Sequence, residues 1–170
     1  MTRIEAIVQQ RRDKLQRIRQ RGVDPYPHRY HRTHTTKEAA AIFEQWEGSG
    51  NNPPQVSLCG RIMSSRPMGK ATFIDIRDGS GKIQCYFRSD RLGVERYELL
   101  KEFDIGDIIG ISGKMFRTKS GEITVAASDF VLLSKSLQPL PEKWHGLTDV
   151  EKRYRQRYLD LISNEEIAPI

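Results

Sequence analysis

Two neighbouring runs of the sequence alternate apolar residues with side chains that can bind nucleobases. Between residues 71 and 88 the apolar positions are Ile74, Ile76, Ile83, Cys85 and Phe87. A β-strand points the intervening residues to the opposite face, and these are Phe73, Asp75, Arg77, Lys82, Gln84, Tyr86 and Arg88. Exposed aromatic rings stack on bases, for roughly 1–3 kcal/mol each, and a neighbouring amide can read a base edge. The pattern predicts a surface for single-stranded nucleic acid, although cover by a loop or another domain would also explain outward rings.

Positive charge is concentrated at the beginning of the chain. The whole sequence has a net charge of +6, and residues 1–34 hold nine Arg or Lys against three Asp or Glu, so this segment carries the whole excess. A basic arm suits a polyanion, because each neutralised phosphate releases counterions; a solvated helix face is the alternative. The residues we expect to contact phosphates are Arg11, Arg12, Lys14, Arg17, Arg19 and Arg21.

Two further patterns look like catalytic sites and have simpler explanations. The run Gly79-Ser80-Gly81-Lys82 suggests a phosphate loop, but it lacks the longer glycine spacing and leads into a strand, which favours a hairpin turn. Asp104 and Asp107 could be paired carboxylates, but they flank a glycine turn, where turn and capping roles suffice. We therefore expect no catalytic residue and no cofactor in this chain.

Histidines and cysteines are sparse. His28, His31 and His34 lie three residues apart without an acidic or cysteine neighbour, which favours a solvated or phosphate-facing role over a metal site. Cys59 and Cys85 lie in strand-like runs and are expected to be buried free thiols. No apolar run reaches the roughly 18 residues that span a membrane, and the arginine-rich N-terminus lacks the apolar core of a secretory signal. These features predict a cytoplasmic protein.

The nucleobase-binding surface requires a sheet, and the sequence predicts five strands. They are expected at residues 55–66, 71–78, 82–88, 107–117 and 122–133. A helix over Val94–Phe103 would separate the third strand from the fourth. This is the order of an OB-fold barrel, which commonly binds oligonucleotides on its second and third strands. The predicted fold class is mainly β, a five-stranded OB-fold barrel with an N-terminal helical extension and a C-terminal connector helix.

Helices are predicted before the barrel. Thr2 and Glu5 form a capping-box pattern that starts the first helix, whose thin apolar stripe would leave its arginines in water. A short helix is expected near Lys37–Trp46, followed by a Gly- and Pro-rich linker at residues 48–54.

One helix is predicted after the barrel. A stiff Pro139-Leu140-Pro141 connector leads to a second capping-box pattern at Thr148 and Glu151. The apolar stripe of this helix consists of Val150, Tyr154, Tyr158, Leu161 and Ile162. The stripe needs a partner, so we expect the chain to be cut off before a further domain.

Several stretches stand out for their length: residues 60–73, 104–110, 116–122, 137–147 and 153–162. They resemble the N-terminal, anticodon-binding region of bacterial-type class II lysyl-tRNA synthetases. The resemblance covers essentially the whole chain and is weakest at residues 35–54. It implies three parts: a basic extension and linker (1–54), an anticodon-binding OB-fold (55–134), and a connector with the start of a truncated catalytic domain (135–170).

The resemblance also implies roles for particular residues. In the aspartate, asparagine and lysine subgroup, an Arg, a Phe and a Gln at the spacing of Arg66, Phe73 and Gln84 read the central anticodon uridine. Phe73 would stack on that base, and Arg66 and Gln84 would hydrogen-bond its edge. Glu122 matches a lysine-branch residue that reads the first anticodon base, and an exposed turn carboxylate is its alternative explanation.

The resemblance implies an activity that belongs to a protein longer than this chain. Full-length members attach lysine to tRNA(Lys) with ATP and Mg²⁺, and the parent would be a homodimer. The chain itself would bind tRNA(Lys) and be inactive alone. Two alternatives stay open. One is a free-standing OB-fold nucleic-acid-binding or regulatory module, against which the unpartnered C-terminal helix argues. The other is an aspartyl- or asparaginyl-tRNA synthetase, which usually lacks the long basic helix.

Overall fold

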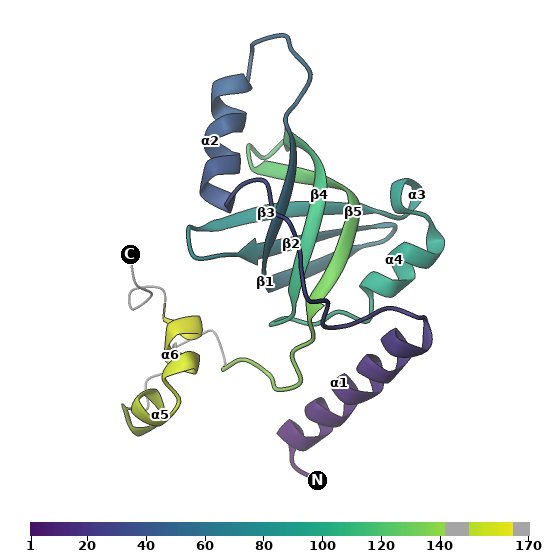
Figure 1. Ribbon diagram of the computed structural model, residues 1–170, viewed down its shortest axis with the longest axis vertical. Helices are drawn as coiled ribbons and strands as arrows, with labels where there is room; N and C mark the ends of the chain where they lie inside the picture. The colour runs from purple at the N-terminus through teal and green to yellow at the C-terminus, as the bar shows by residue number, and fades with distance from the viewer. Residues whose placement is uncertain (142–149, 165–170) are drawn as a thin grey trace.

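The computed structural model describes residues 1–141 and 150–164, and its centre is a five-stranded sheet (Figure 1). The strands are Gln55–Met68 (β1), Ala71–Arg77 (β2), Lys82–Arg88 (β3), Ile108–Arg117 (β4) and Ile123–Ser134 (β5). They pair in the order β1-β2-β3-β5-β4, and β4 also pairs with β1, so the sheet closes on itself. Only β3 and β5 run parallel. The mainly-β prediction is confirmed, with helices at both ends of the chain.

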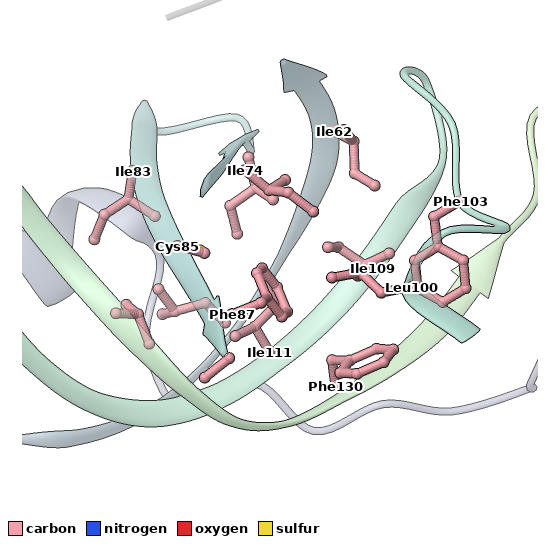
Figure 2. Close-up of a cluster of buried hydrophobic side chains, with 14 of the residues drawn as sticks. Ile62, Ile74, Ile83, Cys85, Phe87, Leu100, Phe103, Ile109, Ile111 and Phe130 are labelled. Carbon is pink, nitrogen blue, oxygen red and sulfur yellow. The ribbon is translucent and has the colours of Figure 1, made fainter. Parts of the chain in front are cut away.

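The core fills the inside of this closed sheet. The residues predicted to point inward from β2 and β3 are all buried: Ile74, Ile76, Ile83, Cys85 and Phe87. Figure 2 shows Ile74, Ile83, Cys85 and Phe87 in one cluster with labelled side chains from β1, β4 and β5. The Phe130 ring packs edge-on against Phe87 and Phe103, with centroids 5.7 and 5.6 Å apart. The predicted alternation is therefore confirmed, and the intervening residues lie on the outer face.

Helix α1 (Arg3–Gln20) begins with the predicted capping box. The Thr2 hydroxyl accepts from the Glu5 N–H at 3.2 Å, and the Glu5 carboxylate accepts from the Thr2 N–H at 2.6 Å. The helix packs mainly through its C-terminal half, where Leu15 and Ile18 are buried. Its N-terminal half is mostly exposed.

Helix α2 (Thr36–Trp46) lies where the sequence predicts a short helix and is tied to the turn between β2 and β3. The N–H and hydroxyl of Thr36 both donate to the Asp78 carboxylate at 2.9 Å. Burial opposes ionisation of this carboxylate, but the hydrogen bonds from Thr36 and Ser80 outweigh it and lower the pKa of Asp78. The hydrogen bonds of this turn therefore favour the ionised form of Asp78.

The helix between β3 and β4 differs from the prediction. The expected Val94–Phe103 segment ends earlier, as α4 (Val94–Leu100), and a short helix α3 (Ser89–Leu92) precedes it. Gly93 separates the two with a φ of +86°, in the left-handed region that favours glycine. The glycine therefore breaks what would otherwise be one longer helix.

The predicted C-terminal helix is two helices, α5 (Val150–Arg155) and α6 (Arg157–Ser163), so the single-helix prediction is wrong. The chain leaves the helical region at Gln156, with φ −124° and ψ 62°. The buried Asp160 joins the two helices by accepting from the Arg153 guanidinium at 2.9 Å. The Thr148 half of the predicted capping box lies outside the described residues. From the stripe, Val150, Tyr154 and Tyr158 are 60%, 80% and 57% exposed.

None of the helices over residues 1–141 and 150–164 has the length and apolarity that a membrane crossing requires.

Candidate nucleic-acid interface

The structure brings Arg66, Phe73 and Gln84 together on the outer face of β1, β2 and β3. Arg66 is the register partner of Phe73 across β1 and β2, and Gln84 pairs with Asp75 across β2 and β3. The Arg66 guanidinium donates to the Gln84 side-chain oxygen at 3.0 Å. Residues far apart in the sequence therefore form one group, as the strand pattern requires.

A row of hydrogen bonds orients these groups before any ligand arrives. Arg66 also donates to the Asp75 carboxylate and to the Ser64 hydroxyl, each at 3.2 Å. On the other side, the Gln84 amide donates to the Thr124 hydroxyl at 2.9 Å. The Arg66 side chain is still 49% exposed. It is therefore aligned by its neighbours and accessible to a ligand.

The aromatic residues form a continuous layer beside this row. The Phe73 and Tyr86 rings stack with centroids 4.7 Å apart, and Tyr86 meets Phe116 at 6.0 Å in a tilted arrangement. All three residues are half-buried, so the rings cover one another in part. Sequence reasoning missed Phe116. Alternation along β4 could have found it, because the preceding Met115 is buried and Phe116 must point outward.

Glu122 lies at the end of the hairpin between β4 and β5. It is exposed, and among the described residues its carboxylate has no hydrogen-bond partner. Its backbone oxygen accepts from the Thr118 N–H at 3.0 Å and from the Thr124 hydroxyl at 3.1 Å. Because Thr124 also binds Gln84, Glu122 lies close to the group formed by Arg66, Phe73 and Gln84. Its role as a base reader stays a prediction.

The expectation that the arginines of α1 remain in water is wrong for Arg11, which is only 7% exposed. Its guanidinium donates to the backbone oxygens of Ile105, Ser136 and Gln138 at 3.0, 3.2 and 3.0 Å. These carbonyls come from the turn before β4 and from the segment after β5. Arg11 therefore ties α1 to the closed sheet, so it is not free for a phosphate.

Two other cations of α1 also have internal partners. Lys14 donates to the Asp104 carboxylate at 2.7 Å, and Arg17 makes a two-pronged pair with Glu102. In contrast, the side chains of three arginines are exposed and have no hydrogen-bond partner within the part of the chain that the structure describes: Arg12, Arg19 and Arg21. The available charge of the arm is therefore smaller than its composition indicates.

Asp104 and Asp107 have the predicted turn role and a further one. The Asp107 carboxylate accepts from the Asp104 N–H at 2.8 Å, as a turn requires. Both carboxylates also accept from the ammonium of Lys135, which is fully buried, at 2.8 and 2.9 Å. Although burial opposes its ionisation, Lys135 and Lys14 hold the pKa of Asp104 below its ordinary value. The cluster anchors β5, the turn before β4 and α1 to one another.

Among the remaining candidates, the Gly79–Lys82 run has a structural explanation. Gly81 accepts from the Asp78 N–H at 3.0 Å, which confirms the predicted hairpin turn between β2 and β3. The His34 ring lies 2.7 Å from the Thr33 hydroxyl. Cys85 is a buried free thiol as predicted, whereas Cys59 is only half-buried. Within residues 1–141 and 150–164, no three His, Cys, Asp or Glu side chains are grouped so that they could hold a metal ion.

Comparison with known proteins agrees with this geometry. Residues 56–133 match the model of the tRNA anti-codon family, described as an OB-fold nucleic acid binding domain. The chain is 54% identical over 158 residues to a lysine–tRNA ligase of Dehalococcoides mccartyi. It is 53% identical over 167 residues to that of Pelotomaculum thermopropionicum, and 49% identical over 158 residues to that of Bacillus cytotoxicus.

These alignments cover 92–98% of this chain but 32% of each relative, so the chain spans about a third of their length. The matched OB-fold region contains the whole closed sheet except its outermost residues. It also contains the group formed by Arg66, Phe73 and Gln84. Residues 56–133 therefore belong to the OB-fold nucleic acid binding domains of the tRNA anti-codon family, and the chain is homologous to the N-terminal region of lysine–tRNA ligases.

Proposed function

We propose that this chain recognises the anticodon of tRNA(Lys) as the RNA-reading part of a lysine–tRNA ligase. The observation that carries the proposal is the Arg66–Gln84 pair, at 3.0 Å, beside the Phe73 ring on an OB-fold face. The similarity to lysine–tRNA ligases supports tRNA(Lys) as the RNA partner.

The hydrogen-bonding groups on this face suit a uridine at the centre of the anticodon. Arg66 offers N–H donors to the O4 acceptor of the base, and the Gln84 oxygen can accept from the N3–H group. Cytidine carries an amino donor where uridine carries O4, so it would face the Arg66 donors with another donor. Phe73 supplies a stacking surface that is indifferent to base identity. Discrimination therefore comes from Arg66 and Gln84, and affinity from Phe73.

Two further contacts complete the proposal. The Glu122 carboxylate would accept from the N3–H group of a uridine at the first anticodon position. The exposed cations Arg12, Arg19 and Arg21 would contact phosphates, which orients the RNA without specifying its sequence. Arg11, Lys14 and Arg17 are left out of this set because their partners lie within the protein.

The catalytic activity would belong to the whole protein. We infer that it attaches lysine to tRNA(Lys) in the cytoplasm, that it binds ATP and Mg²⁺ outside this chain, and that it is a homodimer. The chain alone would bind RNA and lack ligase activity.

Titration of labelled anticodon stem–loops at one fixed salt concentration tests the proposal. The protein should prefer a loop with a central uridine to one with a central cytidine, and Arg66→Ala and Gln84→Ala should each reduce that preference. Phe73→Ala should weaken binding of both loops by roughly 1–3 kcal/mol. Lys101→Ala, at an exposed position after α4, is the control. Equal affinity of the unmodified protein for the two loops would contradict the proposal.

A further inference from the structure

Helices α5 and α6 lie on the opposite side of the closed sheet from α4 in Figure 1. They form one body, because the buried Asp160 carboxylate of α6 accepts from the Arg153 guanidinium of α5 at 2.9 Å. Their apolar stripe contributes little to attaching them, since three of its residues are mostly exposed: Val150, Tyr154 and Tyr158. Other contacts must therefore fix this pair of helices to the sheet.

Arg77, the last residue of β2, makes one such contact. Its guanidinium donates to the backbone oxygen of Ile162, the penultimate residue of α6. The last carbonyls of a helix have no partner within the helix, and α6 carries no basic residue in its last turn. A cation from β2 therefore supplies the C-terminal contact that α6 does not provide for itself.

The neighbours of Arg77 in the sheet favour this contact. Its register partners are Arg61 on β1 and Lys82 on β3, so cations lie on both sides of it. Burial, and then the nearby charge of Arg77, lower the pKa of Arg61. Repulsion between like charges therefore favours an Arg77 guanidinium that turns away from its sheet neighbours and toward the backbone oxygen of α6.

A cavity of about 430 Å³ lies between the outer face of β1 and β2 and the C-terminal segments. Arg66 and Asp75 line it on the sheet side, and Leu140, Ile162 and Ser163 line it on the other side. Residues across such a space do not pack against one another, so directional hydrogen bonds define the position of α6 here. The cavity also places the proposed uridine-binding Arg66 and the end of α6 on opposite walls of one space.

The segment that follows β5 is fixed in the same way. Arg11 of α1 donates to the backbone oxygens of Ser136 and Gln138 at 3.2 and 3.0 Å. The Pro-Leu-Pro run at residues 139–141 then restricts the backbone. Arg11 and Arg77 therefore hold the chain after the closed sheet at two points by the same chemistry, a guanidinium that donates to backbone oxygens.

We infer that Arg77 is a positioning residue for the charging of tRNA. It fixes α5 and α6 relative to the sheet face that carries Arg66, Phe73 and Gln84, so α6 keeps one orientation toward RNA bound there. Orientation matters in charging because the anticodon stays on the sheet while the other end of the RNA must meet the amino acid. The part of the inference that concerns RNA rests on the proposed function, whereas the fixation of α5 and α6 does not.

Distances between two spin labels test the fixation in this chain. The labels are attached through Tyr158→Cys on α6 and Gln45→Cys on α2, both at exposed positions, in a Cys59→Ser background. The other thiol, Cys85, is buried. The distance distribution should be narrow and should broaden in Arg77→Ala. Arg77→Lys, which keeps a cation with N–H donors, should restore part of the narrowing.

Arg91→Ala is the matched control, because it removes an exposed arginine from α3 and should leave the distribution narrow. Thermal unfolding checks that each variant is folded. A broad distribution in the unmodified protein, or an unchanged one in Arg77→Ala, would overturn the inference.

The consequence for charging is measured in a lysine–tRNA ligase that contains this chain. Arg77→Ala should lower kcat for the attachment of lysine to tRNA(Lys) by roughly 10- to 100-fold, because misplacement of the reacting groups costs that much rate. Lysine-dependent exchange of pyrophosphate with ATP should be unchanged, since it requires no tRNA. The preference for a central uridine should also be unchanged, because Arg66 and Gln84 are intact.

A merely structural role of Arg77 would lower the exchange rate, the uridine preference and kcat together, and that result would overturn the inference. An unchanged kcat in Arg77→Ala would overturn it as well. If the unmodified protein does not prefer a central uridine, the proposed function fails, and the label distances still decide whether Arg77 fixes α5 and α6.

Discussion

Helix α1 and the outer face of β1–β3 both depend on arginine, and they use it in opposite ways. Arg11 on α1 is buried and donates to three backbone carbonyls. Arg66 on the sheet donates to side chains and is half exposed. Backbone carbonyls in folded segments cannot turn away, whereas a glutamine side chain can exchange its partner for a base. Whether an arginine supports the fold or awaits a ligand therefore depends on its acceptors.

The carboxylates that pair with these cations differ between the two regions in the same way. Lys14 and Arg17 of α1 have carboxylate partners on the segment before β4, so the basic arm is attached to the rest of the protein by its own charges. On the sheet, Asp75 holds Arg66 in position without burying it. Counting charged residues along a sequence misses this distinction, because the count does not show which acid each cation pairs with.

Breaking the buried cluster of Lys135, Asp104 and Asp107 should have the largest effect on stability. Lys135→Ala leaves Asp107 buried without its cation, so we expect the free energy of unfolding to fall by about 3–5 kcal/mol. Urea denaturation measures this change. Lys101→Ala removes an exposed lysine and should leave the free energy of unfolding nearly unchanged. A loss below about 1 kcal/mol for Lys135→Ala would mean that the cluster does not anchor the fold.

The neighbouring residues Arg11 and Arg12 allow a buried and an exposed arginine to be compared directly. Arg11→Ala should lower the free energy of unfolding by about 1–3 kcal/mol, because buried carbonyls lose their donor. Arg12→Ala, at an exposed position, should stay within about 0.5 kcal/mol of the unmodified protein. Chemical denaturation of both variants gives the comparison. Equal losses would remove the distinction between the buried and the exposed arginine.

The exposed cations of α1 should affect RNA binding without affecting base choice. The triple variant Arg12→Gln, Arg19→Gln, Arg21→Gln should lower the slope of log affinity against log salt by about 0.7–0.9 for each lost phosphate contact. Its preference for a central uridine should be unchanged, because phosphate contacts carry no sequence information. Titrations at several salt concentrations measure both quantities. A changed base preference with an unchanged slope would make α1 a reader.

The smallest expected effect concerns Asp78, which joins α2 to the sheet through hydrogen bonds from neutral donors. Its pKa is lowered in the folded protein, so its ionised form stabilises the fold above the ordinary pKa of about 3.9, and this contribution disappears as the pH falls through the folded value. The stability advantage over Asp78→Asn should therefore be larger at pH 7 than at pH 3. Thermal unfolding at both pH values checks this. An advantage that grows on acidification would contradict the direction of the pKa shift.

Much of the sheet was predictable because its signals are local. The alternation over β2 and β3 predicts which of Phe73, Ile74 and Cys85 points inward, and the structure agrees. Alternation alone does not predict that Arg66 and Gln84 lie together, because their contact depends on the register between strands. The spacing in the resembling family supplied that prediction. Local alternation therefore predicts which side chains point outward, and strand register decides which of them lie next to one another.

Other features depend on partners distant in sequence. Nothing around Arg11 or Lys135 indicates that these cations are buried, because their acceptors lie about a hundred and about thirty residues away. The break between α5 and α6 at Gln156 also escapes prediction, because no glycine or proline marks it. Burial of charge is a tertiary property, and composition cannot reveal it.

The parallel pairing of β3 with β5 joins only three residue pairs, Gln84 with Thr124, Cys85 with Val125 and Tyr86 with Ala126. Strand pairings between distant segments require slow loop closure, so this short seam is expected to be the costly step in completing the ring. Gln84 meets the strand that follows Glu122 across this seam, through its hydrogen bond to Thr124. Under the proposed function, closure of the sheet would also assemble the anticodon-binding surface, so a chain with an open seam would not discriminate anticodons. RNA that binds only the closed sheet would in turn stabilise the seam, and the unfolding temperature would rise with the logarithm of the RNA concentration.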